Sequence, residues 1–243
     1  MNGILLENQS FRLELSFKKC YNITAYWVFP RGQNNFCKER KNMDKFQIIL
    51  ASGSPRRIEM MRRSGMEPII IKPDVDETLS MDLTPEQAVM FLALKKALCV
   101  EQQVKPCDGQ WLIGADTVVC REKIMGKPQD EAEARSMLED LRGKEHRVIT
   151  GVAILAPGST KRKVFAETTK VFFKDYDDKV ITDYIASGEV WDKAGAYAIQ
   201  GGFHDQVDHI EGDYDNVVGF PWERFVDELK LLSEGELDLS QTK

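Results

Sequence analysis

The residues best suited to chemistry lie where an apolar run ends at Ser52 and Ser54, which flank a glycine and precede a proline and two arginines. A buried strand that runs into a helix N-terminus leaves backbone N–H groups without partners, and such groups bind anions. Arg56 and Arg57 add guanidinium groups that suit phosphate, although cations in the first turn of a helix oppose its dipole. The stretch fits either a phosphate site or an ordinary strand–helix turn with solvated arginines.

Two charged residues interrupt apolar patterns further along the chain. Lys96 is the only charge on one stripe of the helix expected from residue 85, and Asp116 lies in an apolar strand pattern over residues 111–120. A lysine in such a place more often packs its stem and extends its amine to water. A buried, unpaired carboxylate is costly, so we expect Asp116 to be paired, metal-bound or facing a cavity, unless backbone donors satisfy it.

Other unusual residues complete a set that suits a nucleotide. Glu77 lies in an acidic loop and, with Asp116, offers carboxylates for a hard divalent cation, which needs one or two such groups plus substrate phosphates. Lys127 and Lys193 add cations for a polyphosphate. Gln200 lies in a stretch rich in small residues, 192–202, whose backbone could approach a planar base, although a plain glycine-rich connection would look the same.

The elements that must position these residues alternate between strands and helices from residue 46 onward, which predicts an α/β domain. Hairpin-like pairs, such as 146–155 with 164–173, indicate a mixed sheet. The segment 213–220 is expected to lead to a last strand. We divide the chain into a loosely attached extension (1–45), the domain (46–233) and an acidic tail (234–243). Neither a G-x-G-x-x-G nor a P-loop fingerprint is present.

Composition narrows the classes of function. The 243 residues carry a net charge of −6, which argues against nucleic-acid or anionic-membrane partners, and no run is long and apolar enough to span a membrane. Five cysteines without a Cys-x-x-Cys pair make a disulfide framework or structural zinc site improbable. With no signal-peptide pattern, the expected location is the cytoplasm.

Taken together, these motifs resemble the Maf family of nucleoside triphosphate pyrophosphatases between residues 46 and 232. The motifs that carry the resemblance, in family order, are ASGSPRR, DVDET, LALKKA, GADTVV, GKP, GKEHRVITGVA, DKAGAYAIQG and NVVGFP. The resemblance implies a mixed twisted sheet flanked by helices, with two lobes around a cleft, similar to the inosine triphosphate pyrophosphatase fold. It also implies hydrolysis of nucleoside triphosphates to the monophosphate and pyrophosphate, and allows a homodimer.

The resemblance also assigns roles to residues. Asp116 would be the proton acceptor, with Lys96 and Glu77 in the catalytic set, and Asp116 and Glu77 would hold Mg²⁺ or Mn²⁺. Base choice is associated with three positions that here follow the dTTP/UTP branch, with SPRR, ADT and IQG in place of SPWR, SDQ and SEG. These positions and the other expected substrate contacts are Ser52, Ser54, Arg56, Arg57, Thr117, Lys127, Lys193 and Gln200; between the two arginines, Arg56 is assigned to the base and Arg57 to phosphate.

Two departures and three alternatives accompany this interpretation. Val190 replaces the usual proline, and Ala198 replaces a glycine that would leave the base loop more freedom. The alternatives are the same reaction on 7-methyl-GTP, the same reaction on other modified nucleotides, and a nucleotide-binding regulator of cell division with little turnover.

Overall fold

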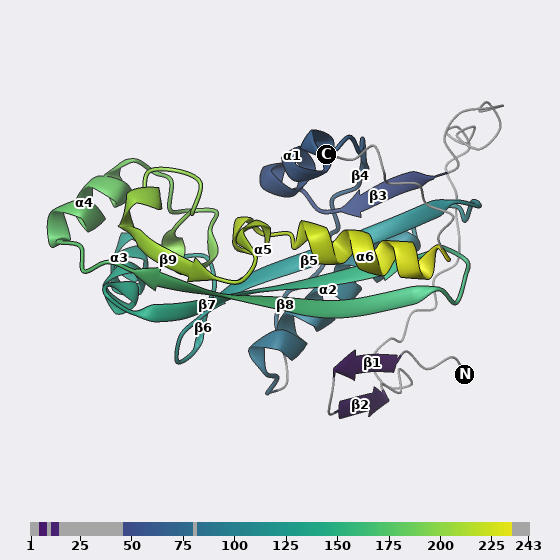
Figure 1. The fold of residues 1–243 in the computed structure, drawn as a ribbon, viewed down its shortest axis with the longest axis horizontal. Helices are drawn as coiled ribbons and strands as arrows, with labels where there is room; N and C mark the ends of the chain where they lie inside the picture. Colours follow the sequence, from purple (N-terminus) through teal and green to yellow (C-terminus); the bar gives the residue numbers. More distant parts are fainter. Residues whose placement is uncertain (1–4, 9–10, 15–45, 80–81, 235–243) are drawn as a thin grey trace.

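Seven strands of the chain form one sheet, with helices on both of its faces (Figure 1). The computed structural model describes residues 5–8, 11–14, 46–79 and 82–234. The elements are β1 (Leu5–Asn8), β2 (Phe11–Glu14), β3 (Gln47–Ala51), α1 (Pro55–Arg63), β4 (Ile69–Ile70), α2 (Pro85–Glu101), β5 (Gln110–Cys120), β6 (Ile124–Met125), α3 (Glu131–Leu141), β7 (Glu145–Leu155), β8 (Arg162–Phe173), α4 (Asp178–Ala186), η2 (Ala194–Ala196), η3 (His204–Gln206), β9 (Val207–Glu211), α5 (Tyr214–Val218) and α6 (Trp222–Leu232).

The main sheet has the order β4-β3-β5-β7-β8-β9, with β6 paired to β5. The strands β4, β3 and β5 are mutually parallel, and β5, β7, β8 and β9 are antiparallel to their neighbours. This confirms the predicted mixed sheet and the predicted pairing of β7 with β8. Short tight connections suffice for the antiparallel pairs, whereas the parallel pairs need helical crossovers, which α1 and α2 supply.

One face of the sheet is covered by α2, which approaches the strands unusually closely. A side chain at Gly114 would place its Cβ 2.3 Å from the carbonyl oxygen of Ala93, and one at Gly151 would lie 2.4 Å from that of Val89. Only glycine allows a helix backbone so near the sheet. The spacing between α2 and the β5–β7 pair is therefore set by these two positions.

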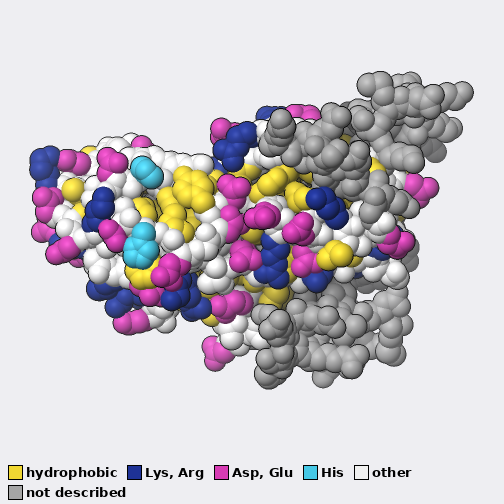
Figure 2. All heavy atoms as spheres, in the orientation of Figure 1, with side chains coloured by type: hydrophobic (Ala, Val, Ile, Leu, Met, Phe, Trp, Pro, Cys, Tyr) yellow, Lys and Arg dark blue, Asp and Glu magenta, His cyan; other side chains and the backbone are white. Residues whose placement is uncertain are grey.

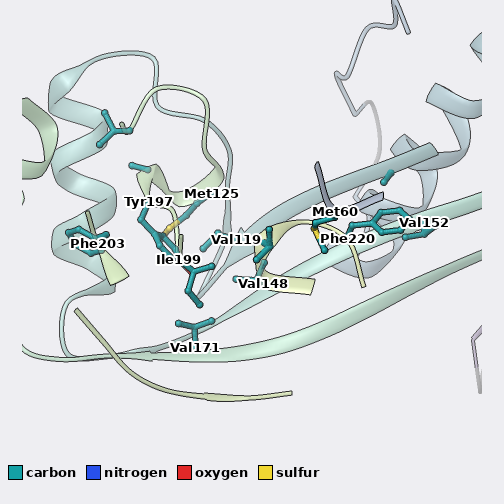
Figure 3. Packing of buried hydrophobic residues seen from close by; sticks show 14 of the residues in the cluster. Met60, Val119, Met125, Val148, Val152, Val171, Tyr197, Ile199, Phe203 and Phe220 are labelled. Atoms are coloured by element: carbon teal, nitrogen blue, oxygen red, sulfur yellow. The ribbon is translucent and has the colours of Figure 1, made fainter. Parts of the chain in front are cut away.

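The larger apolar core lies on the opposite face and continues from one lobe, which contains α3, α4 and β9, to the other, which contains α1, β3 and α6 (Figure 1 and Figure 3). At one end Phe203 and Tyr197 pack with Ile199, and at the other Phe220 packs near Met60. Large-to-small changes in such a core cost about 2–5 kcal/mol each, so both lobes draw stability from one packed layer. The cleft between them is therefore bounded by walls that share a core.

The last strand of the sheet lies elsewhere in the chain than the sequence predicts. The last strand is β9, which precedes residue 213, so the prediction that 213–220 leads to it is wrong; that segment forms α5 instead. The strand was missed because Val207–Glu211 is mostly polar and half exposed at the sheet edge. Within the predicted extension, β1 and β2 form an antiparallel pair, and the acidic tail from 235 lies outside the described residues.

Of the described cysteines, Cys99 and Cys120 are free, whereas Cys107 is disulfide-bonded. The sequence predicts no disulfide framework, and the structure nevertheless has a disulfide at Cys107. No helix in the described part of the chain is long and apolar enough to cross a membrane.

Candidate active site

A cleft of about 620 Å³ lies across the carboxyl ends of β3 and the middle of β5. Its walls come from the turn 51–57, the segment 72–79, α2, β5, the stretch 124–127, β7 at Val148 and the loop 192–199, with 217–219 closing one side. The ends of neighbouring parallel strands meet at the same sheet edge, and ligands of open α/β sheets bind there. Residues far apart in sequence are thus brought to one place.

The N-terminus of α1 faces this cleft and lacks the usual side-chain cap. Ser54 occupies the capping position, but its hydroxyl accepts no hydrogen bond from the helix, and the first turn contains no acidic residue. Instead, Ser52 Oγ accepts a hydrogen bond from the backbone N–H of Ser54 at 3.2 Å, which shapes the turn. The uncapped N–H groups and the positive end of the helix dipole favour an anion here.

Asp116, Lys96 and Glu77 form the charged centre of the cleft. The Lys96 ammonium lies 2.6 Å from Asp116 Oδ1 and 2.9 Å from Glu77 Oε1. The side chains of Asp116 and Lys96 are 10% and 11% exposed, whereas that of Glu77 is 57% exposed. Lys96 thus does not extend its amine to bulk water, and Asp116 faces the cleft and is paired, as one of the sequence interpretations required.

The position of Glu77 depends on α2 through two further contacts. Lys95 Nζ donates a hydrogen bond to the carbonyl oxygen of Asp76, and Cys99 Sγ lies 3.6 Å from that of Asp74. The acidic loop is therefore tied to the same helix that carries Lys96. Because both carboxylates meet one ammonium, their oxygens already converge on a single cation.

This donor set also suits a divalent metal ion. Two carboxylates that converge on one point, next to a cleft able to admit phosphate oxygens, are ligands that Mg²⁺ and Mn²⁺ prefer. Among the described residues, no cluster of three or more His, Cys, Asp and Glu side chains could hold a metal by itself. A metal would thus depend on substrate oxygens for the rest of its coordination.

Arg57 holds several walls of the cleft together. Its Nε donates to the carbonyl oxygen of Gly219 at 2.9 Å, Nη1 to the carbonyl oxygen of Ala115 at 3.1 Å and to Ser52 Oγ at 3.3 Å, and Nη2 to Thr117 Oγ1 at 2.8 Å. Four of the five guanidinium N–H groups are used in this way. Burial lowers the pKa of Arg57, and the charge of Asp116 opposes that shift.

This bonding differs from the sequence interpretation, in which Arg57 mainly holds phosphate. One N–H group remains for a ligand, so phosphate contact by Arg57 stays a prediction, while the visible role is to position Ser52, Ala115 and Thr117. The separation of 162 residues between Arg57 and Gly219 explains why no local pattern indicated this role.

A buried polar network behind Thr117 was missed by sequence reasoning. Thr117 Oγ1 lies 3.0 Å from Thr150 Oγ1, which donates to the carbonyl oxygen of Asn216 at 3.2 Å. The Asn216 amide in turn donates to the carbonyl oxygen of Val148 and to Thr169 Oγ1, both at 3.0 Å. Thr150, Thr169 and Asn216 are fully buried, so the network fixes α5 and the carbonyl of Gly219 against the sheet. In the sequence, the sign of this network was Thr150, a polar residue inside the apolar strand pattern 148–155.

The loop 192–200 forms the opposite wall. Gly195 has φ +69°, and a Cβ there would lie 2.9 Å from Val119, so the loop lies flat on β5. Tyr197 Oη is 2.7 Å from Nε2 of the buried His146, and the backbone N–H of Ala198 donates to Tyr184 Oη at 3.1 Å. These contacts fix residues 196–199 beside the cleft.

Two predicted residues of this loop are placed differently from the others. Lys193 lines the cleft, but its ammonium is bonded to the carbonyl oxygen of Glu189 and to Asp192, both at 2.6 Å. Gln200 is exposed and does not line the cleft. The structure therefore brings together Ser52, Ser54, Arg56, Arg57, Glu77, Lys96, Asp116, Thr117, Lys127 and Lys193, and leaves Gln200 outside.

The cations of the cleft fall into two groups. Arg57, Lys96 and Lys193 are bonded to protein groups, as described above. Arg56, Lys72 and Lys127 line the cleft and make no side-chain hydrogen bond or ion pair with any residue that the structure describes. Lys72 was not singled out from the sequence, because a lysine after a short strand carries no distinguishing pattern.

The described surface shows no comparable concentration of one charge on the face seen in Figure 2, where acidic and basic side chains are intermixed. Among the described residues, six lysines and arginines line the cleft against three aspartates and glutamates, which makes it a local concentration of positive charge in a chain whose net charge is −6. Such a concentration raises the local population of anionic ligands.

The chain is similar in sequence to proteins of one known family. The profile of the family described as "Maf-like protein" matches residues 47–232. A dTTP/UTP pyrophosphatase of Geobacillus sp. (strain WCH70) is 48% identical over 76% of this chain and 98% of its own length. Proteins of the same name from Bacillus cereus (strain ATCC 10987 / NRS 248) and Geotalea uraniireducens (strain Rf4) are each 47% identical, over 79% and 76% of this chain and 92% and 95% of their own lengths.

Solved structures give a weaker match. The Staphylococcus aureus Ham1 protein aligns with a TM-score of 0.47 and 14% identity, over 79% of this chain and all of that one.

Proposed function

The chain belongs to the Maf family, and from this premise we propose that it hydrolyses nucleoside triphosphates to the monophosphate and pyrophosphate, with dTTP and UTP as substrates. The observation that carries the proposal is the buried Asp116–Lys96 pair, which faces the uncapped N-terminus of α1 across one cleft. Relatives that are 47–48% identical over nearly their whole length bear the name dTTP/UTP pyrophosphatase. The chain is thus an enzyme that acts on acid anhydrides.

In the proposed reaction, a water oxygen attacks the α-phosphorus, the bond from that phosphorus to the bridging oxygen breaks, and pyrophosphate leaves. Asp116 accepts the proton of the attacking water, a role that requires a carboxylate within hydrogen-bond reach. Lys96, 2.6 Å from Asp116, orients this carboxylate through an ion pair in the absence of substrate. General-base help of this kind contributes roughly 10²–10⁴ in rate.

The charges of the cleft stabilise the transferring phosphates. The N-terminus of α1 and Lys127 provide donors and positive charge that the protein itself does not use, so they are available to a polyphosphate. Arg56 is unpaired among the described residues as well, which leaves it free for the base, to which the resemblance assigns it, or for a phosphate. Mg²⁺ or Mn²⁺ would be held by Asp116 and Glu77 together with phosphate oxygens, and would neutralise negative charge there.

The base would lie against the opposite wall of the cleft. The segment Tyr197–Ile199 is fixed by its hydrogen bonds to His146 and Tyr184, and Thr117 is fixed by Arg57. A rigid site of this kind discriminates bases by size and by unpaired polar groups. Gln200 would take part only if the loop moves, because its side chain is exposed.

The decisive experiment measures pyrophosphate release by the full-length protein from dTTP, UTP, CTP, purine nucleoside triphosphates and 7-methyl-GTP, with Mg²⁺ or Mn²⁺. We expect the pyrimidine nucleotides dTTP and UTP to be turned over fastest. Tight nucleotide binding without pyrophosphate release would refute the proposal and favour a regulatory protein. A cytoplasmic location, a homodimer and the lack of nucleic-acid or membrane partners stay predictions.

A further inference from the structure

Lys72 is a cation of the cleft with no assigned task. It is exposed, it lines the cleft, and its ammonium has no ion-pair or hydrogen-bond partner among the described residues. Cleft cations that the protein already uses, such as Lys96, lie between carboxylates. A lysine held at the wall of a cleft without a partner is free to bind a ligand anion.

The course of the chain places Lys72 beside the turn that precedes α1. Leu50 of β3 pairs with Ile70 of β4 in parallel register, and the N–H of Ile71 donates to the carbonyl oxygen of Leu50 at 3.1 Å. The residues that follow β4 therefore run alongside the residues that follow β3. Lys72 comes to lie next to Gly53, in the middle of the turn that forms the anion site.

The stem of Lys72 lies over Gly53. Its Cδ, Cγ and Cε atoms would be 3.4, 3.5 and 3.7 Å from a Cβ at that glycine, which is van der Waals contact. The long aliphatic stem is thus laid across the turn, and its ammonium extends from a supported position. An arm that is partly ordered in this way loses less conformational entropy when it binds an anion.

The sheet order indicates which part of a nucleotide Lys72 would meet. The loop that forms the opposite wall packs on β5 through Gly195 and Val119, and Asp116 lies on the same strand. Going outward from β5, the next strands are β3 and then β4. A nucleotide with its base at the loop and its α-phosphorus at Asp116 would therefore extend its remaining phosphates past the turn after β3, toward Lys72.

We propose that Lys72 binds the pyrophosphate part of the substrate and of the product, by charge-assisted hydrogen bonds from its ammonium to the β- and γ-phosphate oxygens. This inference rests on the proposed function and adds a residue that distinguishes the leaving group from the nucleotide half. Lys72 transfers no proton; it offsets the negative charge that builds up on pyrophosphate as the bond to the α-phosphorus breaks.

The test compares the binding of the two products. Calorimetry would measure pyrophosphate and dTMP binding to the full-length protein and to Lys72→Met, which keeps the stem over Gly53 but removes the charge. We expect pyrophosphate to bind about five- to tenfold more weakly, with dTMP affinity changed less than twofold, because an exposed charged hydrogen bond contributes at most modestly. Lys72→Arg should restore most of the lost affinity.

The matched control is Lys105→Met, which removes one exposed lysine outside the cleft and should leave both affinities unchanged. Unchanged pyrophosphate affinity in Lys72→Met, or an equal loss for pyrophosphate and dTMP, would overturn the inference. Pyrophosphate binding does not require turnover. A wild-type protein that binds pyrophosphate through Lys72 but releases none from any nucleotide would therefore contradict the proposed function and leave this inference standing.

Discussion

The N-terminus of α1 differs from those of α2, α3 and α4, although all four belong to the same domain. In the last three, Thr84, Asp130 and Asp177 each accept a hydrogen bond from the backbone N–H of the third helical residue, and each first turn contains an acidic residue. At α1, the capping serine accepts none, and two arginines occupy the first turn.

The comparison separates helix ends built for stability from one that is left available to a ligand. A side-chain cap is worth about 0.5–2 kcal/mol, and a favourable charge near the helix end about 0.3–1 kcal/mol. α1 forgoes both contributions at the point where it faces the cleft. We therefore expect changes at α1 and its cleft to alter kinetics, and changes at the capped ends of α2, α3 and α4 to alter stability.

The largest effect is expected at Asp116, opposite the open end of α1. Asp116→Asn keeps the shape and an oxygen near Lys96 but removes the proton acceptor, so kcat should fall by about 10²–10⁴. Pyrophosphate release under saturating nucleotide measures the change. Asp130→Asn is the matched control, because asparagine caps α3 as well as aspartate does, and it should leave kcat unchanged. An active Asp116→Asn enzyme would remove Asp116 from the mechanism.

Charge reversal at α1 tests the comparison directly. Arg56→Glu should stabilise α1 by about 0.3–1 kcal/mol, since an acidic residue suits the first turn, and yet raise KM for dTTP by roughly 10- to 100-fold. Thermal unfolding and steady-state kinetics measure the two quantities. The neutral Arg56→Gln should lie between the wild type and Arg56→Glu in both. A variant that is less stable and equally active would show that Arg56 serves the fold instead of the ligand.

The buried His146 should make stability, but not the chemistry of the cleft, depend on pH. Burial lowers its pKa from 6.5 to about 3, so between these values the unfolded chain binds a proton that the folded protein does not. The free energy of unfolding should then fall as the pH drops below about 6.5, by roughly 2 kcal/mol at pH 5 from this group.

The double variant His146→Phe/Tyr197→Phe provides the comparison for this pH effect. It replaces both partners of the 2.7 Å contact and leaves neither one unpaired. Denaturant unfolding at pH 7 and pH 5 should show a smaller difference for the double variant than for the wild type. An equal difference would mean that other groups account for the acid sensitivity.

The smallest effects are expected when single caps are removed. Asp130→Ala and Asp177→Ala should each lower the free energy of unfolding by about 1 kcal/mol and leave kcat/KM unchanged, because both helices begin outside the cleft. Ser54→Ala should change the free energy of unfolding by less than about 0.5 kcal/mol, because its hydroxyl caps nothing. A large loss of stability in Ser54→Ala would contradict the distinction between α1 and the other helices.

The sequence predicted the parts of the fold and site that depend on local patterns. The strands β3, β5, β7 and β8 have apolar patterns, and α2 has its capping box and a lysine on an otherwise apolar stripe, so these elements could be inferred. For Asp116, pairing was one of several open alternatives, and the structure shows the pair with Lys96. The edge strand β9 could not, because its residues lie half exposed and lack alternation.

The missed site residues depend on contacts between distant segments. Arg57 meets Gly219, and Asn216 meets Val148, across 162 and 68 residues. Lys72 reaches the turn after β3 only because two strands pair in parallel. The hydrogen bonds of a side chain depend on its neighbours in space, and the amino-acid sequence alone does not locate these neighbours. The partners of the individual arginines and lysines could therefore be identified only from the structure.

The two glycines under α2 also constrain how this protein can change over evolutionary time. Gly151 pairs directly with Asp116 across the β5–β7 ladder, and the helix it admits carries Lys96. A substitution at Gly151 would displace α2 and with it the ammonium next to the carboxylate. An acceptable change there would need a second, compensating change in α2 at the same time. The spacing of α2 from the sheet and the position of the Lys96 ammonium therefore depend on the same residues. We expect Gly151 and the facing residues of α2 to accept substitutions more rarely than their burial alone would predict.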